Sequence, residues 1–178
     1  EDFQGEQEVI GELGENRVFF LPYLMGERSP HNDPMARGTF LGMTMDTTRG
    51  DMTQAVLEGV AFGLRDSLEV ARSLGIQVTS SKICGGGAKS VLWKKMIANI
   101  LNVRLDVVAC EEGPSYGGAI LAAVGCGEYP SVEAASAAIV KVIDTVEPEP
   151  QLVEKYEERY GKFRKIYPRL RELFQQMG

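Results

Sequence analysis

Gly38-Thr-Phe-Leu-Gly-Met43, followed eight residues later by Asp51-Met-Thr-Gln-Ala-Val-Leu-Glu58, is the stretch of this sequence that constrains the fold most tightly. It joins a short apolar strand to the start of a helix. Asp51 is expected to cap that helix, because a carboxylate can accept hydrogen bonds from the free N–H groups of the first turn. Gln54, three residues further on, is suited to the reciprocal bond of a capping box. The stretch therefore predicts a strand, a turn and a capped helix.

Outward from this stretch, strands and helices alternate. The β-branched and apolar runs predict strands at Val18–Leu21, Thr39–Met45, Lys82–Cys84 and Val103–Val107. Helices are expected from Asp51 to about Leu74, from near Ser90 to Asn102, from about Tyr116 to Val124, after Ser131, and over an apolar stripe from Leu152 to Met177 that is kinked at Pro168. Pro148 and Pro150 are interpreted as a linker. This order predicts an α/β domain with a mixed sheet flanked by helices.

The spacing of small residues in the first long helix also indicates how it packs. Ala55, Gly59 and Gly63 lie four residues apart on one helix face. Each glycine costs the helix roughly 1 kcal/mol relative to alanine, so a compensating contact is expected. We expect another backbone segment to approach this face closely.

Composition restricts the class of protein. The chain has 178 residues, of which 44% are apolar and 25% charged, enough for one well-buried core. Its net charge of −6 argues against nucleic acid and anionic membranes as partners, since both attract clusters of Lys and Arg. Cys84, Cys110 and Cys126 are odd in number and lack C-x-x-C spacing, so neither a disulfide framework nor a zinc site is expected. The sequence has no long apolar run and no basic leader, and the expected compartment is the cytoplasm.

The segment Gly85-Gly-Gly-Ala-Lys-Ser90 is the first candidate for ligand binding. A strand that ends in glycines and opens a helix exposes backbone N–H groups beside the positive end of the helix. The pattern predicts either a nucleotide-contacting turn or only a tight strand-to-helix connection. It is not a P-loop, because Ala88 stands where that motif has glycine. It is not a dinucleotide fingerprint either, because Ser90 replaces the third glycine.

Three segments together resemble the FGGY family of carbohydrate kinases. They are Gly38–Glu58, Gly85–Ser90 and Glu112–Gly125, and they occur in the order and with the spacing of that family. The resemblance covers roughly residues 17 to 176. The segment Phe20–Pro34 is most similar to the branch of the family that acts on D-xylulose.

The family transfers the γ-phosphoryl of ATP to a sugar hydroxyl between two lobes. The resemblance therefore implies the C-terminal lobe of a ribonuclease-H-like, actin-like ATPase fold. Residues 1–16, acidic and poor in apolar side chains, are interpreted as a tail or linker. Residues 17–178 are then the ATP-binding domain, incomplete at its N-terminal edge, and the first residue, Glu rather than Met, is consistent with part of a longer protein.

The resemblance also suggests which residues meet the nucleotide. The adenosine-binding glycine pair of the family corresponds to Gly85 and Gly86, and the candidate nucleotide-binding residues are Gly85, Gly86, Gly87, Ala88 and Ser90. Members of the family often have Asn at the position of Ser90. Since serine is shorter and lacks the paired amide donor and acceptor, Ser90 is either a ligand or only a helix cap. Lys89 either meets a phosphate or is solvated.

Four other polar residues have two interpretations each. His31 is either a turn residue bonded to backbone or, with Arg28, faces the cleft and orders the sugar phosphate or the lobe interface. Glu58 is interpreted as a buried or interlobe hydrogen-bond partner. Arg49 either steers anions or is solvated.

No residue of this chain is assigned to catalysis or to metal binding. Sugar phosphorylation needs a carboxylate base, Mg²⁺ on the phosphates and donors that hold the γ-phosphoryl group in line. In the family the base is an Asp at the end of the N-terminal lobe. Much of the sugar site and a Gly/Thr-rich phosphate hairpin also precede the part of the family sequence that this chain resembles. The aspartates available here do not match that motif: Asp33, Asp46, Asp51, Asp66, Asp106 and Asp144.

The predicted function is therefore that of the nucleotide-binding lobe of a sugar kinase, with ATP and Mg²⁺ as cofactors and D-xylulose as the sugar. Alone, the chain is expected to be inactive, to expose an apolar cleft wall and to self-associate as a homo-oligomer. The alternatives are a kinase for another substrate, such as ribulose, gluconate or glycerol, and a non-catalytic interaction module with the same fold.

Overall fold

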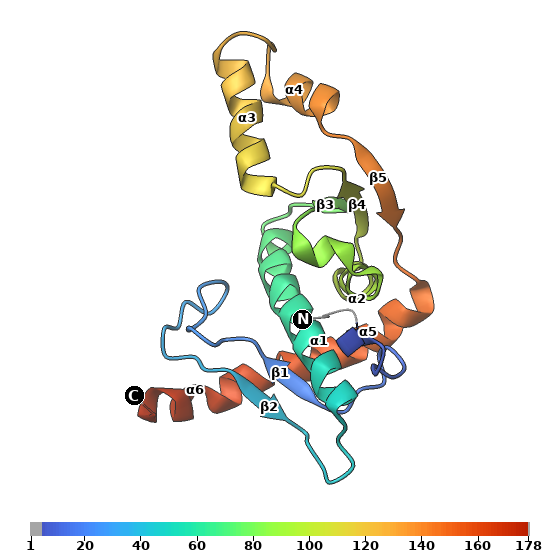
Figure 1. The fold of residues 1–178 in the computed structure, drawn as a ribbon. Coiled ribbons are helices and arrows are strands. Elements are labelled where there is room, and N and C mark those ends of the chain that lie inside the picture. Colours follow the sequence, from blue (N-terminus) through green and yellow to red (C-terminus); the bar gives the residue numbers. More distant parts are fainter. Residues whose placement is uncertain (1–4, 178) are drawn as a thin grey trace.

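A computed structural model describes residues 5–177 of the chain (Figure 1). Two small sheets are present in this range. In the first, β1 (Phe19–Leu21) pairs antiparallel with β2 (Thr39–Leu41). In the second, of strand order β3-β4-β5, β3 (Ser80–Ile83) pairs parallel with β4 (Arg104–Val108), and β4 pairs antiparallel with β5 (Val142–Val146). The predicted mixed α/β architecture is confirmed.

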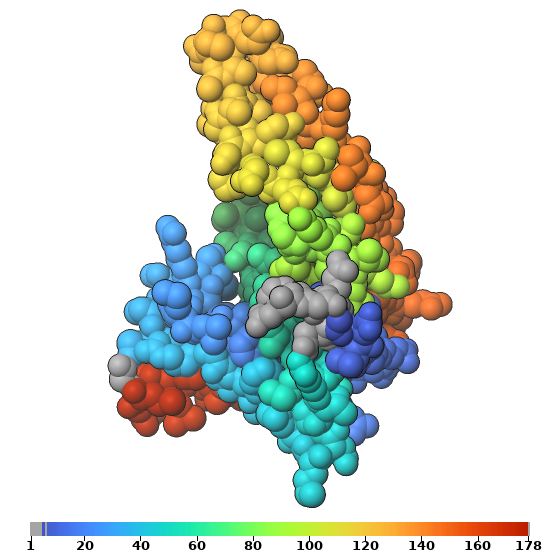
Figure 2. Space-filling model, in the orientation of Figure 1, coloured from blue at the N-terminus to red at the C-terminus, as the bar shows by residue number. Residues whose placement is uncertain are grey.

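Helices surround both sheets. In chain order they are the 3₁₀ helix η1 (Gly5–Gln7), α1 (Arg49–Ser73), the 3₁₀ helix η2 (Gly86–Lys89), α2 (Val91–Leu101), α3 (Gly113–Gly125), α4 (Val132–Ile139), α5 (Pro150–Phe163) and α6 (Ile166–Gln176). Figure 2 shows α3 and α4, yellow to orange, forming a tip at one end of the molecule. Within residues 5–177, none of these helices is both long and apolar enough to cross a membrane.

Helix α1, which follows the strand in the Gly38–Glu58 stretch, is capped differently from the prediction. Thr48, not Asp51, is the N-cap of α1: its hydroxyl oxygen accepts a hydrogen bond from the Asp51 N–H at 3.1 Å. The Asp51 carboxylate reaches back and accepts from the Thr48 N–H at 2.8 Å. The capping box is therefore Thr48 with Asp51. Gln54 is instead buried, and its amide donates to the Glu58 carboxylate at 2.8 Å. At its other end the helix stops as expected, where Gly75 has φ +85°.

The close approach predicted for α1 is present at Gly59. A Cβ atom on Gly59 would lie 2.2 Å from the carbonyl oxygen of Phe20, so β1 crosses the helix at a distance that only glycine permits. Ala55 is fully buried beside Val18 and Phe20. Gly63 meets only the Pro22 side chain, at 3.6 Å.

Strand β2 ends four residues earlier than expected. Gly42 has φ +92°, and a Cβ atom there would lie 2.6 Å from the Arg17 carbonyl oxygen. The chain turns away from the sheet at this glycine. Met43 and Met45 are exposed beyond it, although their apolar character suggested a continuing strand.

The C-terminal part contains two differences from the prediction. The Val142–Val146 segment is a strand, β5, and Pro150 begins α5 instead of marking a linker. The single kinked helix is two helices, α5 and α6, separated at Arg164 and Lys165. Pro168 lies in the first turn of α6, where its missing N–H breaks no helical bond.

The core lies where α1, α2, α5 and α6 meet. Phe62 of α1 packs against three aromatic rings, with centroid distances of 6.2 Å to Tyr156, 5.9 Å to Tyr160 and 5.0 Å to Phe163. The predicted apolar stripe is buried except at Leu170, which is partly buried, and at Met177, which is 74% exposed.

Part of the acidic stretch at the start of the chain contacts this core. Ile10 and Leu13 pack against it. Asn16 is buried, accepts a hydrogen bond from the Val18 N–H at 2.9 Å and donates to the Asp51 carbonyl at 2.8 Å. The boundary between a linker and the domain at residue 17 stays a prediction.

Candidate functional site

The glycine turn connects the end of β3 to the start of α2. Gly85 has φ +85° and ψ −178°, a conformation that glycine adopts at little cost and other residues rarely adopt. A Cβ atom on Gly85 or on Gly86 would meet no atom within 4 Å, so the outer side of this turn is open. Sequence reasoning placed a strand-to-helix turn here, and the structure contains one.

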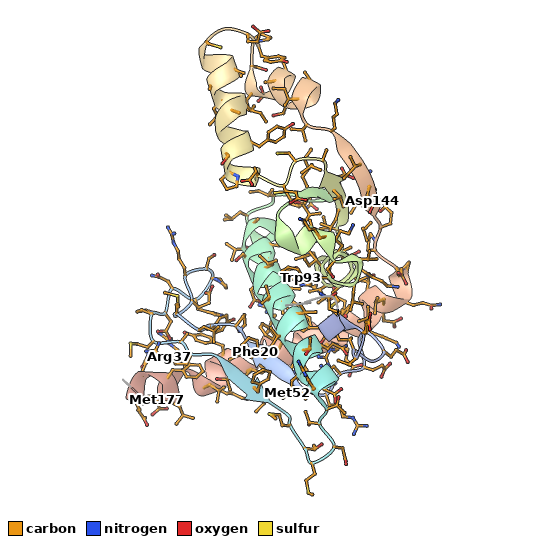
Figure 3. The ribbon with its side chains drawn as sticks, viewed as in Figure 1. Phe20, Arg37, Met52, Trp93, Asp144 and Met177 are labelled. Atoms are coloured by element: carbon orange, nitrogen blue, oxygen red, sulfur yellow. The ribbon has the colours of Figure 1, made fainter. Side chains whose placement is uncertain are left out.

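The inner side of the turn is closed by an aromatic ring. A Cβ atom on Gly87 would lie 2.0 Å from the ring of Trp93, the only tryptophan of the chain (Figure 3). The indole Nε1 is buried without a hydrogen-bond partner within residues 5–177. Gly87 is therefore required for packing, which is a different reason from the one that applies to Gly85.

Two N–H groups of the turn are unused. The amides of Ala88 and Ser90 donate to the carbonyl oxygens of Gly85 and Gly87, at 3.1 and 3.2 Å. Within the described range, those of Gly86 and Gly87 donate to no acceptor. Adjacent unpaired N–H groups on an open glycine turn are suited to an anionic or polar ligand oxygen.

The five candidate residues do not share one surface. Gly85 and Ala88 line a pocket of about 280 Å³, whereas Gly86 projects outward and Gly87 packs on Trp93. Ser90 is the N-cap of α2, accepting from the Trp93 N–H at 3.0 Å, and its hydroxyl donates to the Gln7 side chain at 2.5 Å. These two bonds account for Ser90 as a helix cap.

The pocket beside the turn lies at the carboxyl ends of the parallel strands β3 and β4. This edge is where open α/β sheets commonly bind ligands. Its remaining walls come from the first turn of α2, the loop after β4 and the middle of β5, through Cys84, Lys89, Lys94, Val107, Val108, Ala109, Cys110, Glu111, Ile143 and Asp144. The Gly85 turn therefore forms one rim of a pocket built from three strands and a helix.

Two ion pairs cross this pocket. Lys89 on the turn reaches Glu111 on the loop after β4 at 2.9 Å, and both side chains are exposed. Lys94 is buried and reaches Asp144 of β5 at 3.1 Å. The Lys94 ammonium holds the pKa of the Asp144 carboxyl below its usual range. Lys89 is therefore not only solvated, since its ammonium group also pairs with the Glu111 carboxylate.

Sequence reasoning missed Lys94, Glu111 and Asp144. Asp144 was hidden because β5 was not predicted, although the β-branched run Val142-Ile-Asp-Thr-Val146 resembles a strand. Lys94 sits among the apolar residues of α2, where a buried charge is unusual without a partner on another element.

The signature acid Glu58 is structural, as interpreted from the sequence. It is 1% exposed and accepts hydrogen bonds from Gln54 at 2.8 Å, Tyr156 at 3.2 Å and Arg159 at 2.5 Å. Burial raises the pKa of the Glu58 carboxyl, against the opposing charge of Arg159. The network ties α1 to α5 inside the core.

The loop that carries Arg28 and His31 meets α1 further along the helix, where the Ser67 hydroxyl donates to the Ser29 carbonyl at 3.0 Å. The His31 ring stacks on Tyr167 of α6, with centroids 3.9 Å apart, and the backbone N–H of His31 donates to the Glu27 carboxylate at 3.0 Å. These contacts support the interpretation of His31 as a turn residue. Arg28 is exposed.

Three of the remaining aspartates accept hydrogen bonds from side chains that are distant in sequence. Asp33 accepts from Tyr167 at 2.7 Å, Asp66 from Tyr160 at 2.6 Å and Asp106 from Thr145 at 3.2 Å. Residues 5–177 contain no group of three or more His, Cys, Asp or Glu side chains placed to hold a metal ion.

Comparison with known proteins identifies similar chains. Residues 6–126 match the family described as the FGGY family of carbohydrate kinases, C-terminal domain. A xylulose kinase from Staphylococcus epidermidis is 40% identical over 161 residues, an alignment that covers 90% of this chain and 32% of that protein. The chain thus spans about a third of the length of the curated relatives it matches.

Solved structures agree with the sequence matches. A crystal structure described as a xyloylose kinase from Brucella ovis has a TM-score of 0.83 and 37% identity, covering 94% of this chain and 35% of that one. The ligand-bound xylulose kinase from Lactobacillus acidophilus has a TM-score of 0.89 and 25% identity, covering 99% and 36%.

Proposed function

Because the chain belongs to the FGGY family of carbohydrate kinases, we propose that it is the ATP-binding part of a kinase that phosphorylates D-xylulose on a hydroxyl group. The substrate is proposed from the relatives, two of which are named xylulose kinase at 40% and 35% identity. Kinases of small metabolites work in the cytoplasm, which is the proposed location.

The observation that carries the nucleotide assignment is the open glycine turn. Gly85 and Gly86 leave space where any side chain would stand, and in the described range the N–H groups of Gly86 and Gly87 donate to no acceptor. The adjoining pocket of about 280 Å³ has an apolar wall that includes Val107, Val108 and Ile143. An adenosine moiety fits this combination, because it presents an apolar ring face and polar edges.

ATP supplies the phosphoryl group and, with Mg²⁺, the charge compensation that phosphoryl transfer needs. Gly85, Gly86 and Gly87 are the residues proposed to hold the nucleotide through their backbone, with Ala88 on the pocket wall. Ser90 is proposed to hold the start of α2 and to act on the nucleotide only through that helix. No residue in the described range is assigned to Mg²⁺.

Calorimetric titration of the 178-residue chain with ADP and Mg²⁺ tests the assignment. Wild type is expected to bind. Gly86→Asp is expected to weaken binding at least about tenfold, because a carboxylate at the turn repels the ligand phosphates. Gly125→Asp is the matched control, since it adds the same charge in open space at the end of α3. No heat at millimolar ADP, or equal affinity in all three proteins, would contradict the proposal and favour an interaction module.

A second experiment tests whether the catalytic base lies outside this chain. The chain alone is expected to show no D-xylulose-dependent ATP consumption in a coupled assay, because none of its aspartates is assigned as the base. Measurable turnover that disappears in Gly86→Asp would show that the catalytic machinery is already complete in this chain.

A further inference from the structure

The pocket beside Gly85 contains two thiols that the proposed nucleotide contacts do not use. Cys84 directly follows β3, and Cys110 lies two residues after the end of β4. Both line the pocket of about 280 Å³. Both are free cysteines, as is Cys126, which lies at the end of α3 and outside the pocket. Two of the three cysteines of the chain therefore border one site.

The parallel pairing of β3 and β4 brings these two cysteines to the same edge of the sheet. Ile83 pairs with Val107, so Cys110 is two residues beyond the position opposite Cys84. Neighbouring strands are about 4.8 Å apart. The chain also bends at Ala109, directly before Cys110. A small displacement of the segment after β4 is therefore enough to bring the two α-carbons within the range of about 4.4–6.8 Å that a disulfide spans.

The side chain of Cys84 points toward the segment that carries Cys110. A Cβ atom on Gly113, three residues after Cys110, would lie 2.7 Å from the Cys84 Sγ atom. The sulfur thus lies in space that is open because residue 113 is glycine. Cys84 is exposed, so a soluble oxidant can reach its thiol, and Cys110 is half-buried.

Few hydrogen bonds hold the segment between β4 and α3. Among the described residues, the N–H groups of Cys110 and Glu111 donate to no acceptor. The ion pair of Glu111 with Lys89 is exposed on both sides, and such pairs contribute little to stability. Segments with few internal bonds open at low cost, so this segment can move toward Cys84.

From this placement we infer that Cys84 and Cys110 form a reversible disulfide across the pocket when a peroxide is present. The Cys84 sulfur attacks the O–O bond of hydrogen peroxide, which gives a sulfenic acid and one water molecule. The Cys110 sulfur then displaces the hydroxyl group as a second water, and the S–S bond forms. Two thiols and one peroxide thus give one disulfide and two waters. Cytosolic disulfides are usually transient and redox-sensing in this way.

The bridge draws the segment after β4 toward the Gly85 turn and narrows the pocket between them. This consequence rests on the proposed function, because it concerns the nucleotide. ADP binding to the oxidised chain is expected to be about tenfold weaker or more than to the reduced chain. A thiol reductant such as dithiothreitol is expected to restore it.

Peptide mapping of the 178-residue chain after treatment with equimolar hydrogen peroxide tests the bridge. Monomers isolated under non-reducing conditions are expected to yield a peptide pair that joins Cys84 to Cys110, and to keep Cys126 free. Cys126→Ser is the control and is expected to form the same bridge, whereas Cys84→Ser and Cys110→Ser form none. Absence of the bridged pair in wild type, or equally abundant bridges to Cys126, would overturn the inference.

Calorimetry of the same samples with ADP and Mg²⁺ tests whether the bridge closes the pocket. Peroxide is expected to weaken ADP binding in wild type and in Cys126→Ser, but not in Cys110→Ser. Unchanged ADP affinity in a chain that carries the bridge would overturn the closure. If the reduced chain failed to bind ADP, the proposed nucleotide site would be contradicted, and the peptide map would still decide whether the disulfide forms.

Discussion

At the scale of single residues, neighbouring glycines in the turn serve different purposes. Gly85 is needed for its positive φ, and Gly87 for the space that Trp93 occupies. Neither requirement applies to Gly86. Because it lies in open space beside unpaired N–H groups, its proposed role is contact with the ligand. A run of three glycines in a sequence does not distinguish these cases, because the distinction comes from a tryptophan six residues further on.

These differences predict that an added methyl group destabilises the protein at Gly87 but not at Gly86. Gly87→Ala is expected to lower the free energy of unfolding by about 1–3 kcal/mol, because the new methyl overlaps the Trp93 ring. Gly86→Ala is expected to change it by less than about 0.5 kcal/mol, since the site is open. Urea unfolding followed by circular dichroism measures both. Equal losses in the two variants would show that Trp93 does not pack on the turn.

The buried acid Glu58 permits a second comparison at this scale. Glu58→Ala is expected to cost about 3–5 kcal/mol, because it leaves the Arg159 charge buried without its carboxylate partner. Glu158→Ala removes one partner of an exposed ion pair and is expected to cost at most about 1 kcal/mol. Denaturant unfolding of both variants provides the measurement. A loss for Glu58→Ala as small as that for Glu158→Ala would contradict the assignment of Glu58 to the core network.

At the scale of elements, the start of α1 depends on the Thr48–Asp51 capping box. The sequence placed the helix within two residues but assigned the cap to Asp51, because both Asp and Thr are favourable at that position. Backbone conformation decides between them: Thr48 is extended, with φ −91° and ψ 167°, and Asp51 already lies within the helix. Residue preferences alone therefore do not show which of the two residues is the N-cap.

The capping box predicts a pH-dependent contribution to stability. Hydrogen bonds from Thr48 hold the pKa of the Asp51 carboxyl below its usual range. A depressed folded-state pKa stabilises the fold above the unfolded-state pKa of about 3.9, and this stabilisation is lost as pH falls through the lower value. The stability difference between wild type and Asp51→Asn is therefore expected to shrink between about pH 5 and pH 2. Thermal unfolding across that range measures it, and a constant difference would argue against an ionised Asp51 in the cap.

The elements that sequence reasoning placed and those it missed differ in a physical way. The β3-to-α2 connection and the Asn102 stop of α2 follow from local chemistry: glycines at a turn, and Asn in the left-handed conformation with φ 49°. β5 and the division between α5 and α6 depend on partners distant in sequence. β5 becomes a strand by pairing with β4, which precedes it by about 40 residues.

At the scale of the whole molecule, apolar side chains remain on the outside of α1. Val56 and Leu64 lie two helical turns apart on one face and are 36% and 49% exposed. The aromatic face of the same helix is fully buried against α5. An exposed apolar stripe on a long helix is typical of a surface that another protein segment covers.

This stripe predicts self-association of the isolated chain. Sedimentation velocity is expected to show a concentration-dependent shift to a larger species in wild type, and a monomer in Val56→Glu/Leu64→Glu, because charges on the stripe oppose association. The control is Glu154→Lys/Glu172→Lys, which also changes two exposed residues but places them on α5 and α6, outside the stripe. A wild-type monomer at high concentration would contradict the expectation.

The most direct test of the proposed nucleotide site is the location of bound ADP on the glycine turn. In ¹H–¹⁵N NMR spectra of the labelled chain titrated with ADP and Mg²⁺, the largest shifts are expected at the amides of Gly85, Gly86 and Gly87. A smaller response is expected at the indole N–H of Trp93, whose ring packs against Gly87. Shifts confined to other elements, or no shifts at millimolar ADP, would contradict the assignment of this turn to nucleotide binding.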